Sequence, residues 1–328
     1  MQPLGLDQIT VFGSGLSRPE CVACTRAGAI WVSHALPGHR GGGVARLDTH
    51  GRAHPILAGP GAPSDMMPNG WCMAPDGSFL LANLADSGGV WRLAADGECT
   101  PVLTDIDGLA VPPVNFVHRD PAGRLWISVS TWRIPRDRAF HRDVADGFVI
   151  LLDHDGTRIV ADGLGYSNEV KVDPAGGHLY ANETMARRLS RFPIHCGSGP
   201  TRLGPRETVV DYLDGVIPDG LEFDAEGGVW CASVMSNRLL RVDRDGEQSV
   251  LLEDCDETAI AEGMRHWRDG TFTREHMNIG AARRLRNIAS VTFGGPDLKT
   301  VYLGSLFGDG LFTFRSPVAG AIPAHWDF

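Results

Sequence analysis

An acidic or amide residue stands eight positions before the glycine of a predicted turn at six places along the chain. The pairs are Glu20 and Gly28, Asn69 and Gly77, Asn115 and Gly123, Asn168 and Gly176, Asp219 and Gly227, and Asn287 and Gly295. The first member of each pair offers an oxygen ligand, and no histidine or cysteine shares this position. Oxygen ligands suit a hard cation, Ca²⁺ most comfortably and Mg²⁺ or Mn²⁺ next. If the fold brings these positions together, the pattern predicts one divalent-cation site.

The segments around these pairs repeat a pattern of short apolar strands separated by polar turns. In the repeat that begins at Asp219, the turn of Gly227 is followed by apolar segments at 229–234, 238–242 and 249–252. Successive marker glycines lie roughly 46 to 53 residues apart, except for the last gap of roughly 68. Four short strands with a period near 50 are typical of a β-propeller. We therefore predict an all-β fold, a six-bladed β-propeller with four antiparallel strands per blade around a central channel, as a single domain over residues 1–328. A β-sandwich or jelly roll is the alternative, but these folds lack such a period.

Two segments interrupt the repeats, at about 130–146 and 254–286. The second is a charged stretch with partly helical character. Insertions of this size in a propeller commonly form loops over the ligand face, which is what we expect here. Peripheral decoration is the alternative for each.

In a propeller the first strand of each blade lines the channel, so that equivalent positions converge on the axis. Glu20, Asn115, Asn168 and Asp219 would then present two carboxylates and two amide oxygens to one point. We predict these four as metal ligands, which leaves coordination places for water and substrate. The alternative is that they cap strand starts by bonding to backbone groups, a role for which Glu20 would be an unusual residue.

The chain also resembles, over nearly its whole length, the SMP-30/gluconolactonase family of six-bladed propellers, which includes the luciferin-regenerating enzymes. The landmarks are Arg18-Pro19-Glu20-Cys21, Gly165-Tyr166-Ser167-Asn168, Pro218-Asp219-Gly220 and Phe293-Gly294-Gly295-Pro296-Asp297. The resemblance implies that Glu20, Asn168 and Asp219 bind a divalent cation and that Asn115 completes or borders the site. It gives Asn69 and Asn287 no metal role, and we expect both in the wall of the substrate pocket.

Members of that family mostly hydrolyse lactones, so the resemblance implies metal-assisted ring opening. The cation would polarise the lactone carbonyl, and Asp219, the expected catalytic residue, would position or activate water. Because a carboxylate bound to a cation is a weak base, its direct role as base stays open. Ca²⁺ is the expected ion, with Mg²⁺, Mn²⁺ or Zn²⁺ as substitutes. A phosphotriesterase-like hydrolase on the same metal site and a non-enzymatic calcium-binding propeller are the alternatives.

The third repeat departs from the sugar-lactone members of the family, which carry Asn-Asp-Gly there with an arginine two residues earlier. In this chain Pro113 replaces the arginine and Phe116 replaces the aspartate. With Trp132 in the first insertion, Phe116 predicts a substrate pocket suited to a more hydrophobic lactone or ester. The alternative is that Phe116 packs between blades.

Three polar residues are further candidates for substrate contacts. His118 follows Asn115 by three positions and is an alternative base, although an exposed or core histidine is the commoner case. Arg133 and His141, with other arginines of the first insertion, could meet a substrate carboxylate. Solvated loop charge is the alternative.

The composition narrows the partners. A formal net charge of −10, with 30 Lys and Arg against 40 Asp and Glu, disfavours binding to nucleic acid or to anionic membranes. The first residues lack the basic and apolar regions of a signal peptide, and no apolar run reaches the roughly 18 residues of a transmembrane helix. We expect a cytoplasmic protein that acts on a small molecule, as a monomer or a small homo-oligomer.

Overall fold

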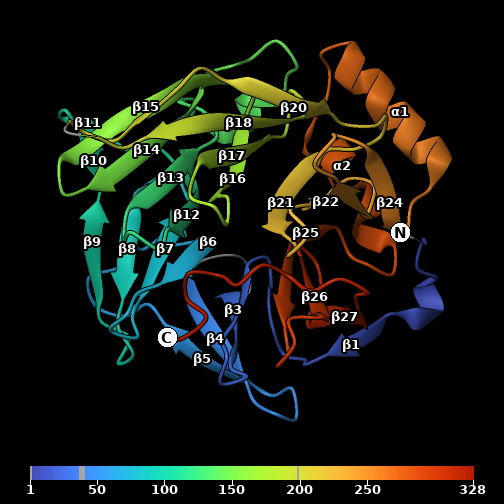
Figure 1. Cartoon of the computed structure of the whole chain (residues 1–328), viewed down its shortest axis with the longest axis horizontal. Coiled ribbons are helices and arrows are strands. Elements are labelled where there is room, and N and C mark those ends of the chain that lie inside the picture. Colours follow the sequence, from blue (N-terminus) through green and yellow to red (C-terminus); the bar gives the residue numbers. More distant parts are fainter. Residues whose placement is uncertain (1, 37–40, 198) are drawn as a thin grey trace.

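The computed structural model describes residues 2–36, 41–197 and 199–328, and six four-stranded antiparallel sheets follow one another around a centre (Figure 1). The first three sheets are β2 (Val22–Cys24), β3 (Ile30–Ala35), β4 (Gly42–Leu47) and β5 (Ala53–Leu57); β6 (Pro68–Met73), β7 (Phe79–Asn83), β8 (Val90–Leu93) and β9 (Cys99–Leu103); and β12 (Val114–Arg119), β13 (Leu125–Val129), β14 (Gly147–Asp153) and β15 (Gly156–Leu164). The six-bladed β-propeller predicted from the sequence is confirmed.

The last three sheets complete the ring. They are β16 (Ser167–Val172), β17 (His178–Glu183), β18 (Arg188–His195) and β20 (Glu207–Asp211), with the short β19 (Arg202–Leu203) also on β18; β21 (Pro218–Phe223), β22 (Val229–Ser233), β23 (Arg238–Val242) and β24 (Gln248–Glu253); and β25 (Ile288–Gly294), β26 (Thr300–Ser305), β27 (Leu311–Arg315) and β1 (Thr10–Phe12). Strand β1 pairs with β27 in the register Thr10 to Thr313, so the sixth blade takes its outermost strand from the start of the sequence (Figure 1). The sequence pattern did not reveal this closure.

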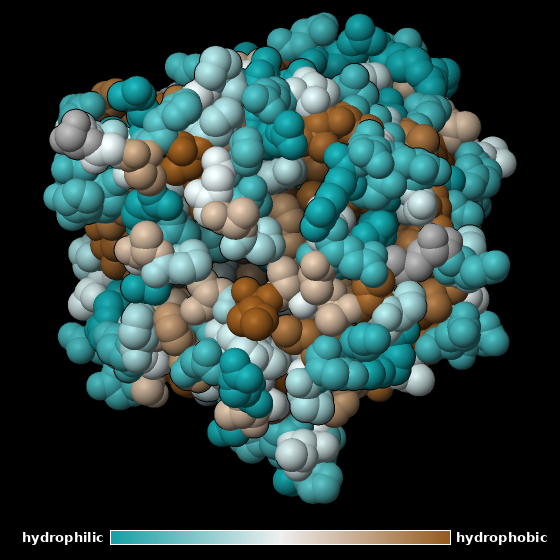
Figure 2. Space-filling view, in the orientation of Figure 1, coloured by the Kyte–Doolittle hydropathy of each residue, from teal (hydrophilic) through white to brown (hydrophobic). Residues whose placement is uncertain are grey.

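The few remaining elements lie outside the six sheets. They are a small hairpin, β10 (Asp105–Ile106) and β11 (Leu109–Ala110), the 3₁₀ helices η1 (Leu6–Gln8), η2 (Arg136–Ala139) and η3 (Ile279–Ala282), and the helices α1 (Glu257–Arg268) and α2 (Arg274–Met277). No helix among the described residues has the length and hydropathy needed to cross a membrane. On the face shown in Figure 2 hydrophilic residues predominate, and hydrophobic residues gather beside a hollow near the centre.

An aspartate at the end of the inner strand explains the repeated turn pattern. Asp120 Oδ1 accepts the backbone N–H of Arg124, and Asp120 Oδ2 accepts the indole N–H of Trp126 at 2.9 Å. Asp224 does the same for the backbone N–H of Gly228 and, at 3.0 Å, for the indole of Trp230. Both tryptophans are fully buried, so loss of either carboxylate would leave an unpaired indole donor at a cost of about 1–3 kcal/mol.

The core lies between neighbouring blades. Trp126 of the third blade packs with Leu179 of the fourth, and Trp230 of the fifth packs with Phe293 of the sixth at 4.9 Å between ring centroids. Since each blade is held by its neighbours in this way, the innermost strands β2, β6, β12, β16, β21 and β25 keep fixed positions around the axis.

The two insertions share one hydrophobic cluster. Asp256 caps α1 by accepting the backbone N–H groups of residues 258 and 259, and Ile260 and Met264 of this helix are buried. They belong to the same cluster as Phe140 of the first insertion and Phe272 of the second, whose rings lie 6.4 Å apart. The insertions therefore form one packed unit.

Candidate functional site

A small cavity on the channel axis brings together the four predicted metal ligands, and we call it the ring cavity. Its empty space amounts to about 370 Å³, part of which is open to solvent. Glu20, Asn115, Asn168 and Asp219 contribute to its wall, and each is at most 7% exposed. The other residues of the wall are Arg18, Arg136, Phe140, Tyr166, Thr184, Val234, Arg274, Met277 and Leu306. The part of the wall formed by the inner strands thus carries carboxylates and amides. The part formed by the insertions carries basic and apolar side chains.

Irregular strand pairing at the start of the inner strands sets the direction of the ring residues. The register of β12 on β13 shifts between Val114 and Phe116, that of β16 on β17 between Ser167 and Val170, and that of β21 on β22 between Pro218 and Leu221. Asn115, Asn168 and Asp219 each lie in one of these intervals. Such bulges redirect side chains and are frequent beside functional sites.

Neighbouring side chains fix the orientation of the two amides. Asn168 Nδ2 donates to Thr184 Oγ1 at 3.0 Å, and that hydroxyl donates onward to the carbonyl of Pro218. Asn115 Nδ2 donates to Ser130 Oγ at 3.2 Å, and that hydroxyl donates to the carbonyl of Ser167. Because both amide nitrogens are engaged, the oxygens are the atoms that can face a ligand, and that of Asn115 also accepts a long hydrogen bond from Asn69 Nδ2 at 3.5 Å.

Of the two carboxylates, that of Glu20 is paired only with Arg18 among the described residues, and that of Asp219 has no partner there. The backbone carbonyl of Asp219 accepts from Asn182 Nδ2, but its carboxylate accepts no hydrogen bond from the described residues. Burial raises the pKa of Asp219 well above the usual range, with further increases from Glu20 and Glu169. Glu20 Oε2 lies 2.5 Å from Arg18 Nη1, yet neither atom has hydrogen-bond geometry to any described group. Buried acceptors that converge without donors fit a hard cation, which would supply the missing positive charge.

Behind the ring residues lies a smaller recess, which we call the axial recess, with about 190 Å³ of empty space that is partly open to solvent. Asn69 lies there and not in the ring cavity. Its Nδ2 donates to the carbonyl of Asn115 at 2.8 Å, and its Oδ1 is buried without a partner. In the sixth blade Ala289 lines the recess, in the interval where the pairing of β25 with β26 shifts. The structure does not bring Asn287 to either space, because Asn287 is fully buried and donates to the carbonyl of Met277.

Both insertions contribute to the ring cavity, through Arg136 and Phe140 of the first and Arg274 and Met277 of the second. The other predicted residues of the first insertion lie elsewhere. The Trp132 ring stacks on Phe148 at 4.2 Å and is 40% exposed. Arg133 pairs with Asp146 at 3.1 Å, and His141 Nδ1 accepts the backbone N–H of Asp143. None of these three lines the ring cavity as the described residues define it.

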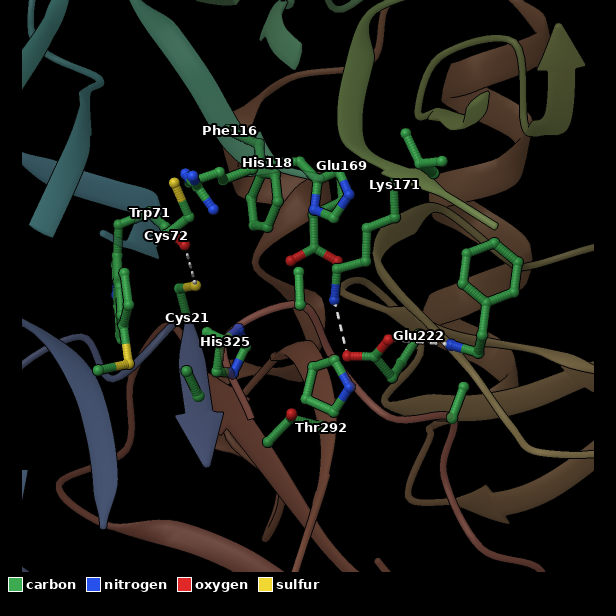
Figure 3. Close-up of a pocket in the computed structure, with 18 of the residues that line it drawn as sticks. Cys21, Trp71, Cys72, Phe116, His118, Glu169, Lys171, Glu222, Thr292 and His325 are labelled. Carbon is green, nitrogen blue, oxygen red and sulfur yellow. Dashed lines mark hydrogen bonds and ion pairs between the residues drawn. The ribbon is translucent and has the colours of Figure 1, made fainter. Parts of the chain in front are cut away.

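Phe116 and His118 line a third space that we call the far cavity (Figure 3), and Phe116 also borders the axial recess. This cavity has about 990 Å³ of empty space, part of which is open to solvent, and it is partly lined by the C-terminal residues 321–325 and 328. Phe116 packs with Trp71 and Cys21 between blades, and Gly70 makes room for its ring, since a Cβ there would lie 2.0 Å from Phe116 Cδ2. Phe116 therefore packs between blades, which is the alternative given in the sequence analysis.

The far cavity has its own charged groups. Lys171 Nζ and Glu222 Oε2 form an ion pair at 2.8 Å, and Glu169, which also borders the axial recess, points into the same space (Figure 3). Burial lowers the pKa of His118 to about 3, and its Nε2 has no partner among the described residues. A neutral imidazole so far from the ring cavity is poorly placed to act as a base there.

The sequence did not single out Arg18, Tyr166, Thr184 or Arg274 as site residues. Arg18 and Tyr166 stand inside the landmark stretches and adopt left-handed backbone angles, with φ of 52° and 66°. Such angles are unusual for non-glycine residues and are found at functional sites. Arg274 comes from an insertion, which the repeat pattern does not describe.

Comparison with known proteins agrees with this architecture. A pentonolactonase of Haloferax volcanii is 26% identical over 238 residues, or 72% of this chain, and a 6-deoxy-6-sulfogluconolactonase of Pseudomonas putida is 28% identical over 233 residues, or 70%. The matches cover 66% and 65% of these two relatives, slightly less than two thirds of their lengths. The solved structure of a gluconolactonase from Xanthomonas campestris superposes with a TM-score of 0.68 at 17% identity, over 94% of this chain and 89% of that one. Residues 63–253 match the family described as SMP-30/Gluconolactonase/LRE-like region, and the chain belongs to this family.

Proposed function

We propose that this protein hydrolyses a lactone with the help of one divalent cation held by Glu20, Asn115, Asn168 and Asp219. The observation that carries the proposal is the convergence of four nearly buried oxygen-bearing side chains in the ring cavity. The two lactonase relatives support the reaction class. Oxygen ligands and two carboxylates favour Ca²⁺, with Mg²⁺, Mn²⁺ or Zn²⁺ as substitutes.

When bound, the cation would polarise the lactone carbonyl and stabilise the negative charge that develops on its oxygen. The chain's own residues then orient the reactants. The carboxylate of Asp219 has no partner within residues 2–36, 41–197 and 199–328, and it can hold a water by hydrogen bonding. The hydroxyl of Thr184 accepts a hydrogen bond from Asn168 Nδ2, so the amide oxygen of Asn168 points away from Thr184. The packed insertions limit the access of bulk water to the ring cavity.

We infer that part of the substrate is apolar, but the residues that support this differ from those that the sequence suggested. Phe116 faces the far cavity and carries no weight here. Phe140, Val234, Met277 and Leu306 instead give the ring cavity an apolar wall opposite the ring residues. A lactone ring would pack on this wall with its carbonyl towards Glu20 and Asp219.

The test is hydrolysis of a lactone panel by metal-stripped protein reloaded with Ca²⁺, Mg²⁺, Mn²⁺ or Zn²⁺. Opening of at least one lactone in a cation-dependent manner is expected. A paraoxon-like phosphotriester in the same panel separates the phosphotriesterase alternative, which predicts the reverse preference. Tight cation binding without turnover of any substrate would indicate a calcium-binding propeller and would contradict the proposal.

A further inference from the structure

Arg136 is a cation in the wall of the ring cavity without a negative partner. It belongs to η2 in the first insertion, and its guanidinium lies over the ring of Tyr166, 6.0 Å from the centroid. Within the described ranges it makes no ion pair or hydrogen bond. Burial and the neighbouring charges of Arg274 and Arg18 lower its pKa, as expected of a guanidinium that lacks a counter-ion.

The hydroxyl of Tyr166 is a second unused donor in the same wall. Tyr166 is 3% exposed, and its oxygen has no hydrogen-bond partner among the residues described. A buried polar group without a partner is costly, about 1–3 kcal/mol, and calls for an explanation. The position of Tyr166 is well determined, because its ring also contacts Phe140 at 5.3 Å between centroids.

The charges of the ring cavity do not balance once a divalent cation is present. Two positive charges on the cation would offset the carboxylates of Glu20 and Asp219. Arg274 has its own partner, Asp137, at 2.7 Å. Arg18, which pairs with Glu20 in this structure, and Arg136 are then left without negative partners. The wall would carry excess positive charge close to the place of the substrate.

We propose that the ring cavity accepts a lactone that bears a carboxylate substituent, and that Arg136 and Tyr166 recognise this substituent. The planar guanidinium of Arg136 pairs with both carboxylate oxygens, and the Tyr166 hydroxyl donates to one of them. The apolar residues Phe140 and Met277 border the ring of the substrate between this subsite and the ligands. The inference rests on the proposed lactonase function, which it narrows to an acidic substrate.

Kinetics on a matched pair of lactones test the subsite. The pair is 5-oxotetrahydrofuran-2-carboxylate and its carboxamide, which share the ring and differ in charge. We expect the cation-loaded protein to prefer the carboxylate, and Arg136→Gln to lower kcat/KM for it by about tenfold to a hundredfold, mainly through KM. The carboxamide should lose markedly less than the carboxylate, so that the preference between the two falls, and Arg136→Lys should restore part of that preference.

Arg138→Gln is the matched control, since Arg138 lies on the same 3₁₀ helix, is exposed and does not line the ring cavity. It should leave both rates unchanged. An equal loss on both lactones in Arg136→Gln would overturn the proposal, because the guanidinium would then act on the reacting carbonyl or on folding. No loss on either lactone would also overturn it, because Arg136 would then not recognise the substrate.

Binding separates this proposal from the proposed reaction. Pyroglutamate and its carboxamide are lactam counterparts of the two substrates, and calorimetry reports their affinity without turnover. Tighter binding of pyroglutamate that is lost in Arg136→Gln and weakened several-fold in Tyr166→Phe supports the subsite even if no lactone is opened. Equal affinities of the two lactams for the unmodified protein would reject the subsite whether or not lactones are hydrolysed.

Discussion

Arg18 Nη1 lies 2.5 Å from Glu20 Oε2, so a protein cation occupies one side of the proposed metal ligand. Both side chains are 9% exposed, which makes their electrostatic interaction stronger than at the surface. A divalent cation must compete with this guanidinium for Glu20, and the positive charge of the guanidinium also repels the cation.

Arg18→Gln should therefore bind the cation more tightly, by about tenfold, since one positive charge leaves the site. Calorimetric titration of metal-stripped protein with Ca²⁺ and Mg²⁺ measures the change. Arg133→Gln removes a positive charge from a position outside the ring cavity and should leave the affinity unaltered. Weaker binding in Arg18→Gln would mean that Arg18 orients Glu20 and does not compete.

Asp219→Asn should abolish cation-dependent turnover while it stabilises the cation-free protein at neutral pH. Burial raises the pKa of Asp219 in the folded state, so the unfolded chain loses this proton first and stability falls as pH rises through the interval between the two values. Asparagine does not ionise, so the variant avoids this loss of stability at neutral pH. Urea unfolding in chelator should show a more stable variant at pH 7.5 and little difference near pH 4. Full activity of the metal-loaded variant would refute the assigned role of Asp219.

Thr184→Val should weaken cation binding through Asn168, although Thr184 is not itself a proposed ligand. Valine has nearly the same shape but neither accepts from Asn168 Nδ2 nor donates to the carbonyl of Pro218. Loss of such an orienting partner typically costs about 10–100-fold in metal affinity. Ser130→Ala should act in the same direction through Asn115. Unchanged cation affinity in both variants would show that the amides are not ligands.

The buried histidines of the far cavity should make the protein sensitive to mild acid. Burial lowers the pKa of His118 to about 3 and that of His325 to about 4, with Lys171 adding to both shifts. The unfolded chain accepts these protons first, so stability falls below about pH 6.5 by up to about 1.4 kcal/mol per pH unit and histidine. His118→Gln should flatten this slope in urea unfolding between pH 7 and 5. His154→Gln, at a surface position, should not.

The eight-residue offset predicted most of the ring because it is the length of an inner strand plus its turn. It succeeded for Glu20, Asn115, Asn168 and Asp219, which share the ring cavity. It failed for Asn287, since the bulge of β25 puts Ala289 at the equivalent place.

Tertiary contacts explain what the sequence pattern missed. Phe116 and His118 line the far cavity because they lie farther along β12 than Asn115, and the sequence pattern did not predict this second cavity. Arg136 and Arg274 reach the ring cavity because two insertions, far apart in sequence, pack on one another. A repeat pattern contains no information on such contacts, whereas the landmark stretches did contain Arg18 and Tyr166.

The pairing of β1 with β27 has a consequence for the centre of the molecule. Glu20 belongs to the first blade and Asp219 to the fifth, so their separation depends on the sixth blade that lies between them. Three residues of β1, Thr10–Phe12, form the outermost strand of that blade and join it to the start of the chain. Substitutions that weaken the pairing of β1 with β27, on the outer rim of the propeller, should therefore alter the spacing of these two carboxylates on the axis and change the cation affinity.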